Sequence, residues 1–466
     1  MAKRIEDVLW RAADKLRGVV DAAQYKEFVL GLVFLKYVAD GAAFEVPDEA
    51  RWESVAAAPD GARIDAAMGA VMRADPALAG TLPQIFGRVD RGRLAELVAL
   101  IGSIEFPGER ARDMLGEVYE YFLEKFARAE GKRAGEFYTP AGVVKLLVEV
   151  LEPYSGRVYD PCCGSGGMFV QAAKFVGGDH ERITVHGQEA NERTWRLAKM
   201  NLAIHGMDPR GLGDRWADTF ADELDPGQRA DFVLANPPFN MSDWARRDDD
   251  PRWGYGIPPR GNANFAWLQH IAARLSDRGT AGVVLANGSM SAKQSGEGAI
   301  RAALVEDDLV SCMVALPPNL FRTTAIPACL WFLDRDKSGR GKWPDRRGEI
   351  LFIDARRLGT MVDRTERVLT DDDITRVADT YHSWRGTKPQ PYADEPGFCV
   401  SATIQQVAAH DHVLTPGQFV GSAPSDDDAE PVTDRIARLT KDLFVQFEET
   451  SRLEAVVREQ LGRLDG

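Results

Sequence analysis

The sequence predicts an α/β protein with a doubly wound, mostly parallel sheet, an N-terminal helical domain and a C-terminal helical extension. Three observations support this fold class. Apolar residues recur at helical spacing through residues 1 to 130, short β-rich runs alternate with helical stretches from 131 to 420, and a charged helix with an apolar stripe follows a polar segment after residue 420. A chain of 466 residues is long enough for two or three domains, and we expect their boundaries at residues 130 and 420.

The first 130 residues predict a bundle of five or six helices. Their apolar residues recur three and four positions apart, in three sets: Ile5, Leu9 and Leu16; Tyr25, Phe28, Leu32 and Leu35; Met114, Val118, Tyr121, Phe122 and Phe126. Gly and Pro residues between these spans mark the turns that separate the helices.

From residue 131 onward, short apolar runs have the composition of buried parallel strands. The runs are RVYD, ITVHGQE, DFVLANPP, GVVLANG, VSCMVALP, CLWFLD and EILFID. Helical stretches lie between them, so we expect helices on both faces of the sheet.

The segment GSAPSDDDAEP at residues 421 to 431 is polar and acidic, which indicates a linker or surface loop. The helix expected after it carries an apolar stripe of Ile436, Leu439, Leu443, Phe447, Val457, Leu461 and Leu464. Two interpretations of this stripe stay open, docking on the same chain and contact with another subunit.

Composition narrows the possible functions. The formal charge of −14 is unfavourable for holding a polyanion, so any nucleic-acid contact requires basic residues concentrated on one face or a partner. The cysteines at 162, 163, 312, 329 and 399 lack C-x-x-C spacing, which predicts reduced thiols and no metal site. We expect a cytoplasmic protein, because no signal peptide is evident and Lys36 interrupts the apolar stretch VLGLVFLKYVA.

A glycine-rich loop, PCCGSGG, follows the first expected strand, which ends at Asp160. Gly164, Ser165, Gly166 and Gly167 lead into a helix, and glycine lets a ligand approach the backbone closely. The loop contains no Lys or Arg and no phosphate-binding motif, so a nucleoside with an amino-acid tail is the expected ligand. A plain tight turn is the alternative interpretation.

Glu189 ends the next expected strand, about 20 residues after the loop. A carboxylate in this place can accept both hydroxyls of a ribose, as the acidic residue does in dinucleotide-binding folds. A solvated residue at the strand end is the alternative.

Asn236, Pro237, Pro238 and Phe239 follow the strand DFVLA directly, where open α/β sheets bind ligands. An exocyclic amine on an aromatic ring is a poor nucleophile because its lone pair is delocalised. The Asn236 side-chain oxygen and the Pro237 carbonyl can each accept one N–H of such an amine, which localises the lone pair without a general base. Pro238 stiffens the turn, and the Phe239 ring can stack on an extruded base. A strand-to-loop turn with an Asn cap is the alternative.

These motifs resemble the signatures of the amino-methyltransferases. Residues 160 to 167 match D-P-x-x-G-S/T-G-G, and residues 236 to 239 match [DNS]-P-P-[YF]. Over nearly the whole chain, the sequence resembles the modification (M) subunit of type I restriction-modification systems, an N6-adenine DNA methyltransferase of Rossmann-like fold. DAAQYKEFVLGLVFLKYVAD is similar to that family's N-terminal helical domain, GEFYTP to its upstream cofactor motif, and GVVLANGSM with the residues up to CLWFLDRD to its later strands.

The resemblance implies S-adenosylmethionine as cofactor and the N6 amine of a flipped adenine in DNA as acceptor. The implied cofactor contacts are Glu136, Phe137, Tyr138, Thr139, Pro140, Ala141, Asp160, Gly164, Ser165, Gly166, Gly167, Glu189 and Asp218. Asp218 resembles the acidic residue that faces the adenine amine of the cofactor. The chain departs from the family pattern at Cys162 and Cys163, where small residues are usual, and at Ala141, where a basic residue is common.

The resemblance also implies partners. They are DNA, a separate specificity (S) subunit flanked by two M subunits, and a restriction (R) subunit in the full complex. Two other interpretations stay open, a methyltransferase of a protein glutamine or an RNA base, and a non-catalytic cofactor-binding scaffold. The helical N-terminal domain with GEFYTP argues against the first, and intact Asn236 and Phe239 argue against the second.

Overall fold

The computed structural model describes residues 2–16, 22–41, 44–106, 111–130, 139–177, 180–321, 326–422, 440–441 and 444. Residues 1–420 form one compact unit and residues 421–466 a second. The predicted cofactor residues Glu136, Phe137 and Tyr138 lie outside the described residues. The predicted linker and C-terminal helix lie outside them as well, apart from residues 421–422, 440–441 and 444.

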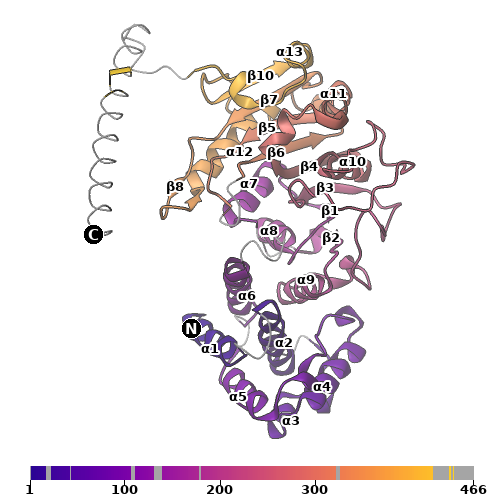
Figure 1. Ribbon diagram of the computed structural model, residues 1–466, viewed down its shortest axis with the longest axis vertical. Helices are drawn as coiled ribbons and strands as arrows, with labels where there is room; N and C mark the ends of the chain where they lie inside the picture. The colour runs from indigo at the N-terminus through magenta and orange to yellow at the C-terminus, as the bar shows by residue number, and fades with distance from the viewer. Residues whose placement is uncertain are drawn as a thin grey trace, which may run out of the picture. The chain divides into compact units, whose positions relative to one another are not determined.

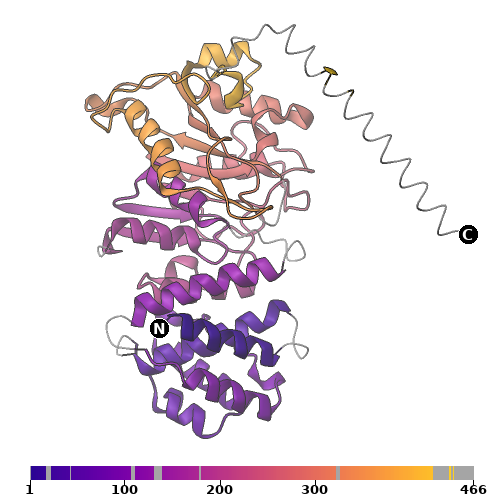
Figure 2. The ribbon, with the colours of Figure 1, turned by 90° about the vertical axis from the view of Figure 1, so that its left-hand side faces the viewer.

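The N-terminal part of the first unit is helical, as the apolar spacing predicts. Its helices are α1 (Ala2–Leu16), α2 (Ala22–Asp40), α3 (Trp52–Ala57), α4 (Gly61–Ala74), α5 (Arg91–Gly102) and α6 (Ala111–Glu130). They pack together in one bundle (Figure 2). The bundle encloses one hydrophobic core, in which Leu9, Phe34 and Phe122 are fully buried. Asp60 and Asp90 cap α4 and α5 with their side chains, which satisfies backbone N–H groups at both helix starts.

An eight-stranded sheet in the order β10-β7-β5-β6-β4-β3-β1-β2 follows (Figure 1). The strands are β1 (Gly156–Asp160), β2 (Ile183–Gly187), β3 (Ala230–Ala235), β4 (Leu275–Ala286), β5 (Val310–Ala315), β6 (Ala328–Asp334), β7 (Glu349–Asp354) and β10 (Cys399–Thr403). Each of the apolar runs that predicted a strand forms one. A separate small hairpin pairs β8 (Thr360–Met361) with β9 (Arg367–Val368).

The sheet is mostly parallel, which confirms the predicted fold class. β2, β1, β3 and β4 pair in parallel, as do β5 and β7. β6 runs antiparallel between β4 and β5, and all its residues are buried because helices cover both faces at the centre of the sheet. The sequence did not predict β10, an antiparallel edge strand whose short segment CVSAT lacks a continuous apolar run.

Helices cover both faces of the sheet, as a doubly wound fold requires. The apolar residues of α7 (Ala141–Leu151), α8 (Gly167–Val176) and α12 (Asp371–Arg385) pack in one core. Those of α10 (Asn264–Arg274) and α11 (Glu297–Glu306), together with Val407 of α13 (Ile404–Ala409), pack in the other. Side chains on alternate residues of each strand reach the two cores.

Helix α9 (Glu192–Ile204) joins the helical part to the sheet. Leu197 and Ile204 belong to the core of the helical bundle, whereas Leu202 belongs to a core of the sheet. The Tyr119 hydroxyl of α6 donates to the Leu197 carbonyl at 3.1 Å. Lys199 donates to the carbonyls of Ala79, at 2.9 Å, and Gly213, at 3.2 Å. One helix therefore shares its surface between both cores and fixes the bundle beside the sheet.

Within the described ranges, no helix combines the length and apolar character that a membrane span needs, and no cluster of His, Cys, Asp and Glu is placed to hold a metal ion. The five cysteines are free thiols, of which four are buried and Cys162 is half-buried.

Candidate active site

A cleft with about 680 Å³ of empty volume lies where β1 and β3 end. It is lined by Glu120, Leu123, Thr139, Ala141, Val144, Asp160, Cys162, Cys163, Gly164, Ser165, Gly167, Met168, Gln171, Asn201 and Asn236. The structure thus brings both sequence motifs, the glycine-rich loop and the tetrapeptide, to one cleft. It also adds residues of α6, α8 and α9, helices that lie next to one another in Figure 1.

The glycine-rich loop joins β1 to α8 in a conformation that needs glycine. Gly164 and Gly166 have positive φ angles of 53° and 81°, a region that a Cβ atom disfavours. A Cβ atom added to Gly164 or Gly167 would have no neighbour within 4 Å, so both residues leave room for a ligand to approach the backbone. The loop is tied internally by the Gly166 N–H, which donates to the Cys163 carbonyl at 2.8 Å.

Glu189 supports the same loop from the end of β2. Its carboxylate accepts the Gly164 N–H at 3.0 Å through Oε2 and the Asn191 N–H at 2.8 Å through Oε1. Glu189 is half-buried. Its hydrogen bond places the carboxylate beside Gly164, which the cofactor is expected to contact. Its predicted role toward a ribose stays a prediction.

Asp160 lines the cleft and is only 2% exposed. Burial raises the pKa of its carboxyl to about 7, although the Cys162 N–H donates to it at 2.9 Å. Among the described residues that line the cleft, Glu120 and Asp160 are acidic and none is Lys or Arg. Glu120 and, above about pH 7, Asp160 carry negative charge, which favours a cationic ligand and disfavours a phosphate group.

Asn236 follows β3 and is oriented by the upstream motif. Its Nδ2 donates to the Thr139 hydroxyl at 2.8 Å, while its Oδ1 is buried without a hydrogen-bond partner in the described part of the chain. An unpartnered buried acceptor costs free energy that a ligand N–H can recover. The side chain therefore presents the acceptor that the predicted chemistry requires.

The rest of the tetrapeptide forms a rigid turn. Pro237 is buried, Pro238 and Phe239 are half-buried, and the Phe239 ring lies 5.7 Å from Phe321 in an edge-to-face arrangement. Asn240, with φ 52°, follows in the left-handed region.

Asn264, the first residue of α10, holds this turn. Its Oδ1 accepts the Asn240 N–H at 3.1 Å, and its Nδ2 donates to the Asn240 Oδ1 at 2.9 Å. Asn264 was not predicted as a site residue, although an Asn in GNANF ahead of an apolar run is a recognisable helix-start signal.

The upstream motif ends at the start of α7. Thr139 and Ala141 line the cleft, and Pro140 is the N-cap residue. The first N–H groups of a helix have no partner within the helix and favour an anion. At the start of α7 these N–H groups lie beside Ala141, which lines the cleft.

Asp218 lies near the cleft but not among its lining residues. Its Oδ1 accepts the N–H groups of Phe220, at 2.8 Å, and Ala221, at 3.0 Å, so it caps a turn. The neighbouring Ala217 N–H donates to the Glu189 carbonyl at 2.9 Å, and the Thr219 hydroxyl donates to the Pro161 carbonyl. The segment is thereby held beside the glycine-rich loop.

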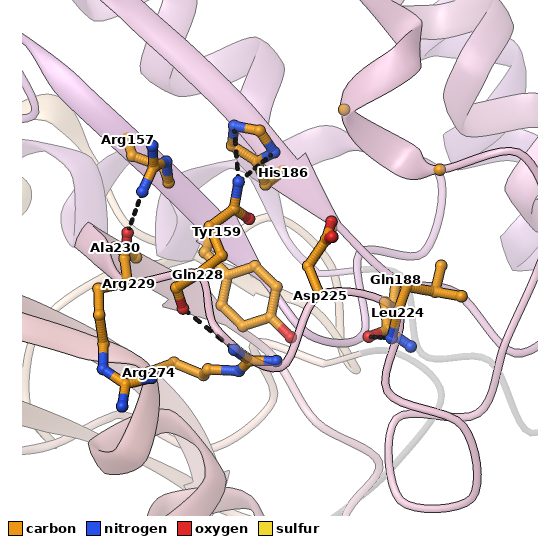
Figure 3. Close-up of a pocket in the computed structure, with 13 residues that line it drawn as sticks. Arg157, Tyr159, His186, Gln188, Leu224, Asp225, Gln228, Arg229, Ala230 and Arg274 are labelled. Atoms are coloured by element: carbon orange, nitrogen blue, oxygen red, sulfur yellow. Dashed lines mark hydrogen bonds between the residues drawn. The ribbon is translucent and has the colours of Figure 1, made fainter.

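A second pocket, of about 370 Å³, contains none of the predicted site residues (Figure 3). Arg157, Tyr159, His186, Gln228 and Arg274 are among its lining residues. Several of its polar groups bind one another: Gln228 to His186 at 3.1 Å, and Arg274 to the Gln228 carbonyl at 3.0 Å. Because these polar groups bind one another, we interpret the second pocket as a gap in the internal packing.

The sequence is similar to known proteins over most of its length. Residues 110–428 match the family described as N-6 DNA Methylase, and residues 5–43 match the HsdM N-terminal domain. The chain is 47% identical over 416 residues to the type I restriction enzyme HindI methylase subunit of Haemophilus influenzae, covering 86% of this chain and 92% of that protein. It is 34% identical to the type I restriction enzyme MjaIX methylase subunit of Methanocaldococcus jannaschii, covering 100% of this chain and 92% of that protein.

The fold is shared as well. A crystal structure of the methyltransferase subunit of a type I restriction-modification system from Streptococcus thermophilus superposes with a TM-score of 0.77 at 24% identity, over 91% of this chain and 100% of that one. The family match covers more than half of the chain, and it includes both the glycine-rich loop and the tetrapeptide. The chain therefore belongs to the N-6 DNA methylase family, as an adenine-specific DNA methyltransferase of the type I modification-subunit class.

Proposed function

We propose that the cleft binds S-adenosylmethionine and that Asn236 holds the N6 amine of a flipped adenine for methylation. One observation carries the assignment: the buried Asn236 Oδ1 has no partner in the described part of the chain, while its Nδ2 is tied to Thr139. A side chain fixed in this way is a preorganised acceptor for an amine N–H.

The residues present fit the cofactor. Its sulfonium and ammonium charges suit a cleft lined by Asp160 and Glu120, and the glycines leave room along the loop. In the proposal, Glu189 accepts the ribose hydroxyls, Asp218 faces the adenine amine, and the N-terminus of α7 takes the methionine carboxylate. When bound, S-adenosylmethionine supplies an electrophilic methyl group.

The tetrapeptide activates the acceptor. Asn236 Oδ1 and the Pro237 carbonyl each accept one N–H of the adenine amine, which withdraws its lone pair from the ring and directs it outward. The Phe239 ring, held by Phe321 and the Asn240 turn, stacks on the base after it leaves the duplex. No general base is needed for this activation.

DNA recognition in this proposal depends on other subunits. The net charge of −14 disfavours tight DNA binding by the chain alone, and its relatives carry the name methylase subunit. We infer a complex of two such chains with one specificity subunit. A restriction subunit joins this complex to form the full assembly. Residues 432–466 are the proposed subunit contact, and their deletion is expected to reduce co-purification with the specificity subunit.

Methyl transfer tests the proposed function. Labelled S-adenosylmethionine and duplex DNA are incubated with the chain alone and with the co-expressed specificity subunit, and the DNA is digested to identify the labelled base. We expect N6-methyladenine with the specificity subunit present. Label on protein or RNA but not on DNA would contradict the proposal.

A further inference from the structure

Glu120, Leu123, Gln171 and Asn201 line the cofactor cleft but belong to neither sequence motif. Glu120 and Leu123 come from α6 of the helical bundle, and Asn201 comes from the shared helix α9. We propose that Glu120 and Asn201 form the subsite for the ammonium group of the cofactor's methionine tail, so that the helical bundle completes the cofactor site. This inference rests on the proposed function.

Glu120 has one carboxylate oxygen engaged and one with acceptor capacity left. Its Oε1 bonds to Lys174 Nζ at 2.6 Å and to His205 Nε2 at 3.1 Å. Its Oε2 has a contact with Gln171 Nε2 at 3.5 Å, the long limit for a hydrogen bond. Burial opposes ionisation, but the hydrogen bonds from His205 and Lys174 outweigh it and lower the pKa of the carboxyl. Glu120 is therefore a carboxylate at neutral pH.

Asn201 contributes a second acceptor. It is 1% exposed, and its Nδ2 donates to the Ser165 carbonyl in the glycine-rich loop at 2.8 Å. Its Oδ1 is buried and has no hydrogen-bond partner in the described ranges. His205 Nδ1 contacts the Asn201 carbonyl at 2.9 Å, so one chain of contacts runs from α6 through His205 and Asn201 to the loop.

An ammonium group matches these two side chains. It carries three N–H donors, a positive charge and no acceptor, whereas the residues offer a carboxylate oxygen and an amide oxygen. Lys174 and His205 occupy Oε1 of Glu120, so the ammonium group meets Oε2, and the carboxylate of the tail meets the N-terminus of α7. The two charges of one amino-acid tail thereby meet opposite partners.

This arrangement links cofactor binding to the docking of the helical bundle. Glu120 belongs to the helical bundle. Lys174 lies in α8, after the glycine-rich loop, and His205 follows α9. A ligand that contacts Glu120 and the loop together stabilises their association, because binding favours the state in which both are in place.

Isothermal titration calorimetry on the full chain tests the subsite. The probes are S-adenosylmethionine and S-adenosylhomocysteine, which carry the ammonium, and methylthioadenosine, which lacks the whole amino-acid tail. For Glu120→Gln we expect a loss of about tenfold to a hundredfold for the first two and no change for the third. Glu117→Gln, an exposed residue one turn away on α6, is the matched control and should bind all three as the unmodified chain does.

Two results would overturn the inference: unchanged S-adenosylmethionine affinity in Glu120→Gln, or equal weakening of all three probes, which indicates a merely structural role. Lys174→Met gives an independent measurement, because it removes the cation that competes for Glu120. We expect unchanged or tighter binding of the two tailed probes, and weakening of all three would again contradict the subsite. If the unmodified chain does not bind S-adenosylmethionine, the proposed function itself fails.

Discussion

The cleft at the glycine-rich loop and the second pocket use opposite faces of the same strand, β1, yet their chemistry differs. Asp160 lines the cleft, whereas Arg157 and Tyr159 line the second pocket, because successive side chains of a strand alternate between faces. Acidic residues line the cleft, together with amide oxygens that have no hydrogen-bond partner among the described residues. In the second pocket three arginines lie among residues that largely bind one another. Within the described part of the chain, the Nε atoms of Arg157 and Arg274 have no hydrogen-bond partner.

The difference teaches that the balance of donors and acceptors, more than empty volume, separates a ligand site from a packing defect. In the cleft, the amide oxygens of Asn201 and Asn236 are buried and accept no hydrogen bond from the residues that the structure describes. In the second pocket, Arg274 also forms an ion pair with Glu223 and lies over the Tyr159 ring, so most of its interactions are internal. Substitutions in the two places should therefore affect different properties.

The largest expected effect is on catalysis. Asn236→Ala removes the preorganised acceptor and should lower methyl transfer about a thousandfold or more, while S-adenosylmethionine affinity stays within about twofold. Gln228→Ala removes an amide from the second pocket and should leave transfer nearly unchanged. Transfer assays and calorimetry on both variants check this, and loss of cofactor binding in a folded Asn236→Ala protein would contradict the assignment.

Two substitutions in the glycine-rich loop should separate the effect on cofactor binding from the effect on stability. Gly167→Ala places a methyl group in the cleft without backbone strain, so we expect about tenfold weaker cofactor binding and unchanged or slightly higher stability. Gly166→Ala, at φ 81°, should cost about 1–2 kcal/mol of stability because a Cβ atom disfavours that conformation. Thermal unfolding and calorimetry distinguish the two, and equal loss of stability in both variants would contradict this account of the loop.

Cofactor affinity should rise with pH through about 7. A cationic ligand favours the ionised form of Asp160, whose pKa is raised to about 7 by burial, so binding is weaker below that pH. The same shift destabilises the fold as pH rises from about 4 to 7, because the folded state holds the proton more tightly than the unfolded chain. Asp160→Asn should flatten the binding profile and raise stability at pH 8 by about 1–3 kcal/mol. Calorimetry from pH 5.5 to 8.5 and denaturant unfolding check both signs.

The smallest effect on cofactor binding is expected for a substitution on the other face of β1. Arg252 donates to His270 Nδ1 at 3.0 Å, which leaves the His270 Nε2–H to bond the Tyr159 oxygen, also at 3.0 Å. Tyr159→Phe leaves that buried donor unpaired and should cost about 1–3 kcal/mol of stability. Cofactor affinity should stay within about twofold. A tenfold weaker affinity in calorimetry would show that the two faces of β1 are coupled.

Local patterns were sufficient to predict much of the fold. The apolar runs from RVYD to EILFID predicted strands correctly because strands buried on both faces require continuous apolar residues. The spacing from Ile5 to Phe126 predicted the helical bundle, because a helix that packs against others buries apolar residues that recur every three or four positions. β10 was not predicted, because an edge strand with half-exposed residues has no continuous run of apolar residues.

The sequence by itself determined which residue types lie at the glycine-rich loop and the tetrapeptide, and from them it predicted the chemistry of the site, because each short segment follows directly on a strand. Only the tertiary structure decided which other residues line the cleft. Glu120 lies 40 residues or more before the loop, and Asn201 faces that loop from α9. Nothing in their own segments marks them, since an isolated Glu or Asn on a helix is usually a solvated surface residue. Packing of α6 and α9 beside the sheet brings them to the cleft, and long-range packing of that kind leaves no short pattern in a sequence.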